Sequence, residues 1–272
     1  MLLTLSIGGI PHVGADVGGF FKDPDEELLV RWYTLFYEHS IKGLPVMRPL
    51  YLEFPDDESG YDEDREWMVG SALLVKPITE PGLKTVSLYL PGRREVWYEW
   101  DTSKARPSPG AVQIPADISR IPVFQKGGTI IPVKEGAKHS SGQMKDDAVT
   151  LYIALNSKGD FANGTVYLDD EESYDYKDGD YAYWSINFKR EHDYLHTITN
   201  KIIDKKGTHD STIHIEKIVI RGAKFYPRTA HIFLDDFTPE PLEFDYDRDN
   251  FLCVIKEPNA FLTSEFRIDL HT

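Results

Sequence analysis

The chain of 272 residues is 41% hydrophobic and 28% charged, a composition typical of a globular protein large enough for one large domain or two to three ordinary ones. Its formal net charge of −15 argues against nucleic-acid binding, because that function needs clustered Lys and Arg side chains. The sequence has no apolar run of the roughly 18 residues that cross a membrane, and its single cysteine, Cys253, excludes an internal disulfide.

The N-terminal stretch combines an apolar run with a glycine-rich turn. The first ten residues are apolar but have no basic start, so we expect no signal peptide. Residues 2–7 predict a short buried strand. Residues 14–21 then place three glycines around Asp16 and before Phe20 and Phe21. Because each glycine costs roughly 0.5–1 kcal/mol relative to alanine, this pattern indicates a turn whose backbone closely approaches a ligand.

A helix is expected after this turn. Asp23 suits the N-cap, Pro24 the first helical position and Glu26 the position of a capping-box acid. We expect the helix to run to about residue 42 and to end at Gly43. Its apolar face is expected to contain Leu28, Trp32, Leu35 and Phe36.

From residue 45 onward the pattern is typical of β-structure. Short apolar runs rich in Val, Ile and Tyr alternate with turn residues, which predicts a β-sandwich or barrel. A polar stretch over residues 134–147 is the expected domain boundary, and a second sandwich is expected after it. The clearest predicted strands cover residues 72–77, 86–92, 149–154, 164–168, 183–188 and 213–220.

Three acidic clusters could supply catalytic carboxylates. They lie at residues 56–58, 62–64 and 169–172. Adjacent acids on one loop lack the buried, opposed geometry that a pair of catalytic carboxylates needs. We therefore interpret all three clusters as solvated turns.

Two segments partly match metal-binding motifs. Residues 245–250 resemble the first half of a calcium loop, but Asn250 and Lys256 stand where glycine and glutamate are required, so we predict a polar turn between strands. His192 and His196 are four residues apart, a zinc-ligand spacing on a helix, yet their surroundings are strand-like. We expect no metal site, and no phosphate loop or dinucleotide motif indicates a cofactor.

Two further features concern carbohydrate. The triplet Asn163-Gly164-Thr165 is an acceptor pattern for N-glycosylation, which makes Asn163 a possible modification site. Aromatic residues at the centres of predicted strands, such as Tyr152, Tyr167 and Trp184, are more often core residues than sugar-binding ones.

Several blocks of the chain resemble segments of glycoside hydrolase family 31, and they occur in the family's order. Each block is weak alone, but together they extend over nearly the whole chain. The blocks are residues 8–21, 28–33, 43–50, 96–98, 121–132 and 167–170.

The resemblance implies a mainly β fold, in which a remnant of a (β/α)8 barrel, residues 1–43, precedes a proximal β-sandwich, 44–136, and a distal β-sandwich, 137–272. It implies retaining hydrolysis of the O-glycosidic bonds of α-linked glucose during N-glycan processing in the endoplasmic reticulum lumen. The implied partners are an α-glucoside or glucosylated N-glycan and a β subunit. Asp16 and Phe20 match family positions that line the glucose-binding pocket.

The chain also departs from the family pattern. The family's aspartate nucleophile and acid/base aspartate precede the glycine-rich motif, and neither segment is present here. After Tyr33 the chain runs directly into what resembles a later family helix, which indicates an internal deletion. One strand and one helix cannot close a barrel of eight strands. We therefore expect no catalytic residue and no activity from this chain alone; the alternative is a non-catalytic β-sandwich that binds carbohydrate or a partner subunit.

Overall fold

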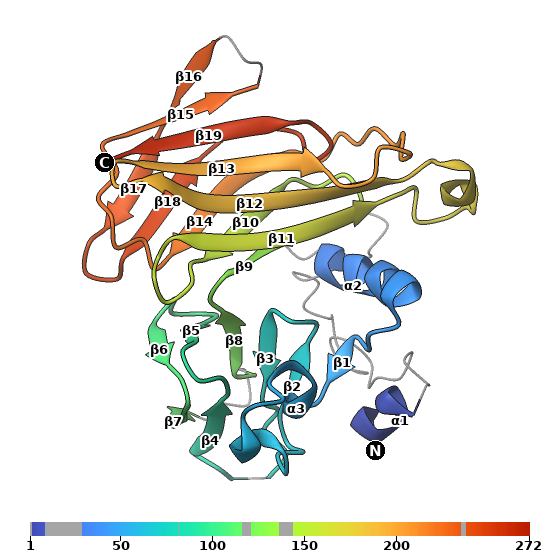
Figure 1. The fold of residues 1–272 in the computed structure, drawn as a ribbon, viewed down its shortest axis with the longest axis vertical. Coiled ribbons are helices and arrows are strands. Elements are labelled where there is room, and N and C mark those ends of the chain that lie inside the picture. Colours follow the sequence, from blue (N-terminus) through green and yellow to red (C-terminus); the bar gives the residue numbers. More distant parts are fainter. Residues whose placement is uncertain (1, 9–28, 81, 116–120, 136–143, 235–237) are drawn as a thin grey trace. The chain divides into compact units, whose positions relative to one another are not determined.

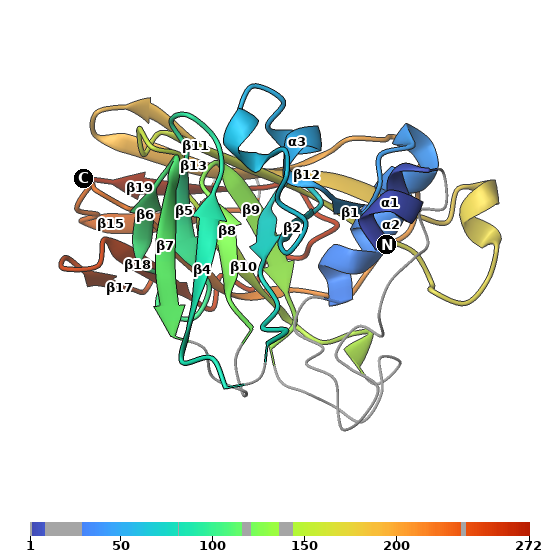
Figure 2. The same cartoon turned by 90° about the horizontal axis from the view of Figure 1, so that it is seen from below.

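The computed structural model describes residues 2–8, 29–80, 82–115, 121–135, 144–234 and 238–272. The chain forms two compact units: unit 1 contains residues 1–15 and 39–127, and unit 2 contains residues 16–38 and 128–272. Figures 1 and 2 show the elements of both. Within the described ranges, no helix has the length and apolar character needed to cross a membrane. The fold is mainly β, as predicted.

The apolar run at the N-terminus is helix α1, Leu2–Ile7, and the prediction of a strand there is wrong. A strand needs a neighbouring ladder to satisfy its N–H and C=O groups, whereas a helix satisfies them within the segment. The hydroxyl of Ser6 donates a hydrogen bond of 3.0 Å to the carbonyl oxygen of Met47, which fastens α1 to the first strand of unit 1.

Unit 1 contains a six-stranded sheet in the order β1-β2-β3-β8-β5-β6 and a two-stranded sheet, β4-β7 (Figure 2). Both contribute to one core, in which Leu88 from β4 packs with Trp97 from β5 and Phe124 from β8. The elements are β1 Met47–Arg48, α3 Leu50–Glu53, η1 Glu58–Gly60, β2 Trp67–Val69, β3 Leu73–Val75, β4 Thr85–Leu90, β5 Val96–Glu99, β6 Ala105–Pro107, β7 Gly110–Pro115 and β8 Val123–Lys126.

Unit 2 contains an eleven-stranded sheet in the order β16-β15-β19-β13-β12-β11-β9-β10-β14-β18-β17 (Figure 1). One face of the sheet forms the hydrophobic core of the unit, and strands such as β9 are buried on both faces. The elements are β9 Thr129–Val133, β10 Val149–Ala154, β11 Phe161–Leu168, η3 Asp175–Asp178, β12 Ala182–His192, β13 Leu195–Ile202, β14 Ile215–Arg221, β15 Thr229–Phe233, β16 Pro239–Leu242, β17 Phe244–Asp247, β18 Leu252–Lys256 and β19 Phe266–His271.

This sheet curls until its two edges lie close together. The edge strands β16 and β17 are separated in sequence only by Glu243, although they stand at opposite ends of the strand order. Residues from both halves, such as Ile268 of β19 and Ile218 of β14, therefore belong to a single core. The predicted strands over 149–154, 164–168, 183–188 and 213–220 are confirmed as β10, β11, β12 and β14.

Helix α2, Leu29–Lys42, ends where predicted. Gly43 has a φ of +72°, and its N–H donates a hydrogen bond of 2.8 Å to the carbonyl oxygen of His39, which is a glycine C-terminal cap. The predicted start at Asp23 lies outside the described residues. The predicted apolar face holds for Leu35, which is buried, but not for Phe36, which is 39% exposed.

Candidate functional site

The residues expected to line a glucose pocket, Asp16 and Phe20, lie outside the described residues. The structure therefore leaves their role as a prediction. The part of the candidate site that it does describe begins with α2, the helix that follows the glycine-rich motif in sequence, and continues into the strands and loops of unit 2 that contact this helix.

Helix α2 rests on the outer face of β11 and β12. The hydroxyl of Thr34 accepts a hydrogen bond of 3.1 Å from the N–H of Tyr167. The ring of Tyr37 stacks on that of Tyr167, with centroids 3.7 Å apart. One carboxylate oxygen of Glu38 accepts hydrogen bonds from the hydroxyls of Thr165, at 2.8 Å, and Tyr183, at 2.9 Å. The contact thus contains tyrosines and hydrogen bonds, together with Val30, which belongs to the core of unit 2 and was not part of the predicted apolar face.

Asp169 is the centre of this contact. It follows β11 and is 7% exposed, and its carboxylate accepts hydrogen bonds from the hydroxyls of Tyr33, at 2.6 Å, and Tyr167, at 3.0 Å, and from the N–H of Glu171, at 2.8 Å. Burial and the nearby Asp169 raise the pKa of both tyrosines. The two tyrosines are therefore neutral donors, and the carboxylate is occupied by them instead of facing a substrate.

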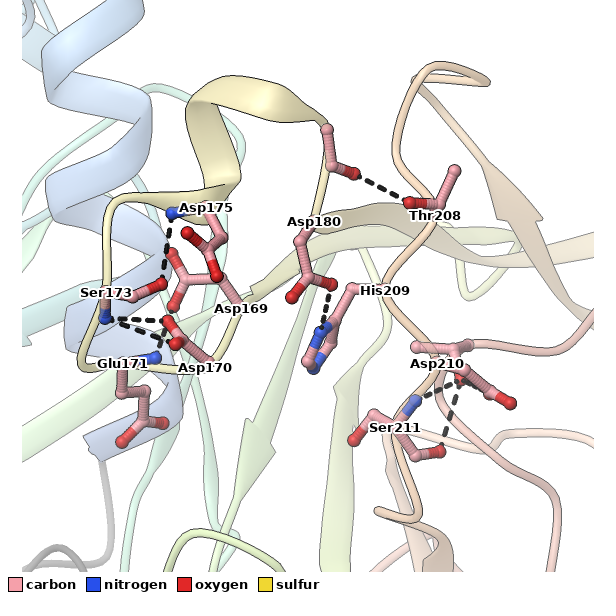
Figure 3. A network of polar contacts seen from close by, with 12 residues as sticks. Asp169, Asp170, Glu171, Ser173, Asp175, Asp180, Thr208, His209, Asp210 and Ser211 are labelled. Carbon is pink, nitrogen blue, oxygen red and sulfur yellow. Dashed lines mark hydrogen bonds and ion pairs between the residues drawn. The ribbon is translucent and has the colours of Figure 1, made fainter.

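The loop after Asp169 is held by its own polar groups (Figure 3). Asp170 accepts hydrogen bonds from the N–H groups of Ser173, at 3.0 Å, and Glu172, at 3.2 Å, and its hydrogen bonds with Ser173 lower its pKa. Asp180 contacts the imidazole of His209 at 2.9 Å. The expectation of a solvated turn therefore holds for Asp170 and Glu172 but is wrong for Asp169, because three donors compensate its burial.

The acidic clusters of unit 1 are mostly exposed, as expected for solvated turns, but each contains one acid with a structural role. Asp57 was expected in a solvated turn, but it is 9% exposed and accepts hydrogen bonds from the hydroxyl of Tyr89, at 2.9 Å, and the N–H of Gly92, at 2.8 Å. Glu63 pairs with the ammonium of Lys76 at 3.2 Å. Each acid ties its loop to a neighbouring strand, and this explains its presence without catalysis.

Sequence reasoning missed Glu66, a buried carboxylate of unit 1. Both of its oxygens lie 3.2 Å from the N–H of Tyr89, and one lies 3.5 Å from the ammonium of Lys76. Burial raises the pKa of Glu66 to about 7. Lys76 also contacts Glu63, so a cation separates the two carboxylates, which is an ion-pair arrangement and not the opposed pair of a glycosidase. In the sequence Glu66 stands directly before an apolar run, and this pattern does not indicate that its carboxylate is buried.

The candidate metal ligands are placed on strands and turns. His192 ends β12, and His196 lies in β13 with its ring stacked on Phe225 at 3.8 Å. In the described part of the chain, no group of three His, Cys, Asp or Glu side chains could hold a metal ion. The predicted polar turn is confirmed between β17 and β18, where Asp247 accepts hydrogen bonds from the N–H groups of Asp249 and Asn250.

The aromatic and glycosylation expectations have different outcomes. Tyr167 and Trp184 are buried, as predicted, whereas Tyr152 is only half-buried. Asn163 lies in β11 and is exposed. Its modification stays a prediction, which the last part of these Results develops.

Comparison with known proteins places both units in one family. The profile of the glycosyl hydrolase family 31 TIM-barrel domain matches residues 1–41, and that of the family 31 C-terminal domain matches residues 43–131. Neutral alpha-glucosidase AB of Dictyostelium discoideum is 34% identical over 322 aligned positions, which cover 100% of this chain and 33% of that protein. A probable glucan 1,3-alpha-glucosidase of Oryza sativa subsp. japonica is 37% identical and covers 98% of this chain and 34% of that protein.

Solved structures show the same fold. The crystal structure of a glucosidase II alpha subunit in a Glc1Man2-bound form has a TM-score of 0.85 and 23% identity, and it covers 100% of this chain and 36% of that one. The catalytic subunit in the ER glucosidase II heterodimeric complex, with the binding domain of its regulatory subunit, has a TM-score of 0.82 and 23% identity over 100% of this chain and 35% of that one.

The match is partial in two respects. The chain spans about a third of the length of the curated relatives. The Dictyostelium alignment needs 322 positions for 272 residues, a difference of 50, so the relative has residues without a counterpart here. Within these limits the chain belongs to glycoside hydrolase family 31 and corresponds to the C-terminal part of its neutral alpha-glucosidase and glucosidase II relatives.

Proposed function

We propose that this chain is the C-terminal portion of a retaining α-glucosidase that removes α-linked glucose from glucosylated N-glycans. Two observations together carry the proposal. The barrel profile and the C-terminal profile of the family match the chain in that order, and the whole chain superposes on a glucosidase II alpha subunit. One solved relative is bound to a Glc1Man2 ligand, and another is an ER enzyme in complex with a regulatory subunit. These findings support a glycan substrate, a β subunit partner and the endoplasmic reticulum lumen.

The proposed layout is a barrel remnant, residues 1–43, followed by a proximal sandwich, 44–136, and a distal sandwich, 137–272. Two separate cores support the two sandwiches. Exposed aliphatic side chains support an additional covering layer in the parent enzyme, since exposed apolar surface often marks an interface. In unit 1 these are Ile7, Ile41, Leu44 and Leu52, each more than a third exposed.

We infer that the chain alone is inactive. A retaining glycosidase needs two carboxyl groups about 5–5.5 Å apart on either side of the scissile bond, one as nucleophile and one as acid/base. Among the described residues, the buried acids have partners: Asp169 and Asp57 have hydroxyl and N–H donors, Glu66 has Lys76 and Tyr89, and Asp269 has the guanidinium of Arg267 at 3.1 Å. In the parent enzyme, Asp16 and Phe20 would line the glucose pocket, while the chemistry would come from residues upstream of the glycine-rich motif.

The alternative of a carbohydrate-binding module has less support. Surface sites for sugars usually need aromatic rings that face solvent. The most exposed tyrosines of unit 2, Tyr174, Tyr194 and Tyr226, lie in separate connections rather than on one sheet face. A flat titration of tryptophan fluorescence with maltose oligomers would be the expected result.

Activity of the purified chain on a chromogenic α-glucoside tests the proposal of inactivity. We expect no hydrolysis above the buffer blank, with Asp16→Asn as the matched variant. Turnover by the chain that Asp16→Asn abolishes would show that it holds a complete site. An immunoblot of the source cells with an antibody against residues 150–272 tests the parent enzyme: a band far above 31.1 kDa is expected, and a band only at that mass would contradict the proposal.

A further inference from the structure

The outer face of β11 presents a short row of side chains to solvent. Burial alternates along the strand, so that Ala162 and Val166 face the core while Phe161 and Asn163 are exposed. Asn163 lies opposite Asn187 of β12. In the part of the chain that the structure describes, no hydrogen bond to the side chain of Asn163 is formed.

Two residues of the triplet Asn163-Gly164-Thr165 are explained by the fold. A Cβ atom at Gly164 would lie 2.2 Å from the carbonyl oxygen of Ile130, so no larger residue fits beside β9. The hydroxyl of Thr165 donates to Glu38 of α2. Only the identity of Asn163 has no structural reason.

Phe161 is the second informative residue. Its side chain is 43% exposed, and two residues along a strand place it on the same face as Asn163 at roughly 7 Å. Covering an exposed phenylalanine ring with an apolar surface is favourable, because it removes the ring from water. The C–H face of a pyranose ring attached to Asn163 would be such a surface.

We propose that Asn163 carries an N-linked glycan whose first sugar packs on Phe161. In the reaction the amide nitrogen of Asn163 bonds to C1 of an oligosaccharide carried on a lipid pyrophosphate. The C1–O bond breaks, the lipid pyrophosphate leaves, and one amide proton is lost to the transferase. The proposal rests on the proposed function only in that the parent protein enters the secretory pathway.

Transfer occurs before unit 2 is complete. In the folded chain the hydroxyl of Thr165 is bound by Glu38, and β11 is paired with β12 from Phe161 to Leu168. Because β12 follows β11 in the chain, the triplet has not yet paired with β12 when it emerges from the ribosome. The exposed side chain of Asn163 then leaves room for the glycan after folding.

The first experiment expresses the chain behind a supplied secretion signal, so that its result is independent of the parent enzyme's function. The wild-type chain is compared with Asn163→Gln and with Asn163→Gln combined with Lys206→Asn. The last substitution completes an equivalent Asn-Gly-Thr triplet at residues 206–208 in an exposed loop and reports entry into the lumen. We expect the wild type to carry one glycan, removed by peptide N-glycosidase F, and Asn163→Gln to carry none. Modification of the control triplet together with an unmodified wild type would overturn the proposal.

A second experiment tests the packing on Phe161. Endoglycosidase H leaves one sugar on the asparagine, whereas peptide N-glycosidase F removes the whole glycan and leaves an aspartate at this position. We expect the one-sugar form to melt about 2–4 °C higher than the sugar-free form, a shift measurable for a unit of this size. In Phe161→Ala, which stays modified, the two forms should melt together. An equal shift in both backgrounds would contradict the contact between the sugar and Phe161.

Discussion

His196 is a buried histidine whose protonation opposes folding. Burial and, to a smaller extent, the nearby Arg190 lower its pKa to about 4. The unfolded chain takes up the proton near pH 6.5, and the folded chain does so only near pH 4, so between these values acid favours the unfolded state. Each pKa unit is worth about 1.36 kcal/mol, and we expect this residue alone to remove up to about 3 kcal/mol of stability as the pH falls from 6.5 to 4.

Urea unfolding at pH 7 and at pH 4 measures this contribution. His196→Phe keeps a ring to stack on Phe225 and should lose the corresponding part of the pH dependence. His192→Phe, at an exposed position, is the control and should keep it. If His196→Phe lost as much unfolding free energy between pH 7 and pH 4 as the wild type does, other groups would be the cause of the acid sensitivity.

Glu171 has a backbone conformation that suits glycine. Its φ is +59°, a region that costs a residue with a Cβ roughly 1–2 kcal/mol, partly offset by the entropy that glycine gains on unfolding. We expect Glu171→Gly to exceed Glu171→Ala in stability by about 0.5–1 kcal/mol. The alanine variant is the matched control, because it loses the same carboxylate. Equal melting temperatures of the two variants would show that the loop relaxes this strain.

At the scale of elements, residues 29–38 of α2 belong to unit 2, and the hydroxyl of Tyr33 is one of the groups that hold them there. Tyr33→Phe removes its donor to the buried Asp169, and a hydrogen bond to a charged group contributes about 1.5–3 kcal/mol. We expect a loss of that size in urea unfolding followed by circular dichroism. Tyr174→Phe, at a position 72% exposed, is the control and should change stability by less than about 0.5 kcal/mol.

A double-mutant cycle makes this test specific. Once Asp169→Asn has altered the acceptor, Tyr33→Phe should cost less than it does alone, because the two groups share one interaction. Strict additivity of the two substitutions would indicate that Tyr33 stabilises α2 by ring packing and not through Asp169.

Sequence patterns predicted those elements that local physics determines. Runs of alternating or β-branched residues identified β10 and β12, and Gly43 identified the end of α2. The patterns failed where distant residues decide. Residues 2–7 form a helix that is bound to β1 through Ser6. On α2, Tyr33 and Glu38 have hydrogen-bond partners more than 100 residues away. Tyr33 and Tyr37 are four residues apart, so a search for tyrosines at this spacing could have indicated the side of α2 that contacts unit 2.

For the candidate site, the order of family blocks gave the family before any geometry. It could not show that Asp169 is buried as an acceptor for two tyrosines, because the residues that surround it come from α2 and β11. Glu66 likewise gave no sequence signal, since its burial depends on Lys76 and on the backbone of β4.

At the scale of the whole molecule, the two units have separate hydrophobic cores. Leu88 belongs to the core of unit 1, and Leu151 belongs to that of unit 2. Both side chains are fully buried. A core that shares few side chains with its neighbour can unfold by itself, so we expect the chain to show two thermal transitions instead of one.

Paired core substitutions can assign these transitions by differential scanning calorimetry. Replacement of a buried leucine by alanine costs about 2–5 kcal/mol, enough to lower a melting temperature by several degrees. Leu88→Ala should lower only the transition of unit 1, and Leu151→Ala only that of unit 2, each serving as the control for the other. His196→Phe provides an independent label for unit 2, since it should remove acid sensitivity from that transition alone. If either leucine substitution moved both transitions equally, the chain would unfold as one cooperative body, and the unit that holds α2 would then depend on its neighbour for stability.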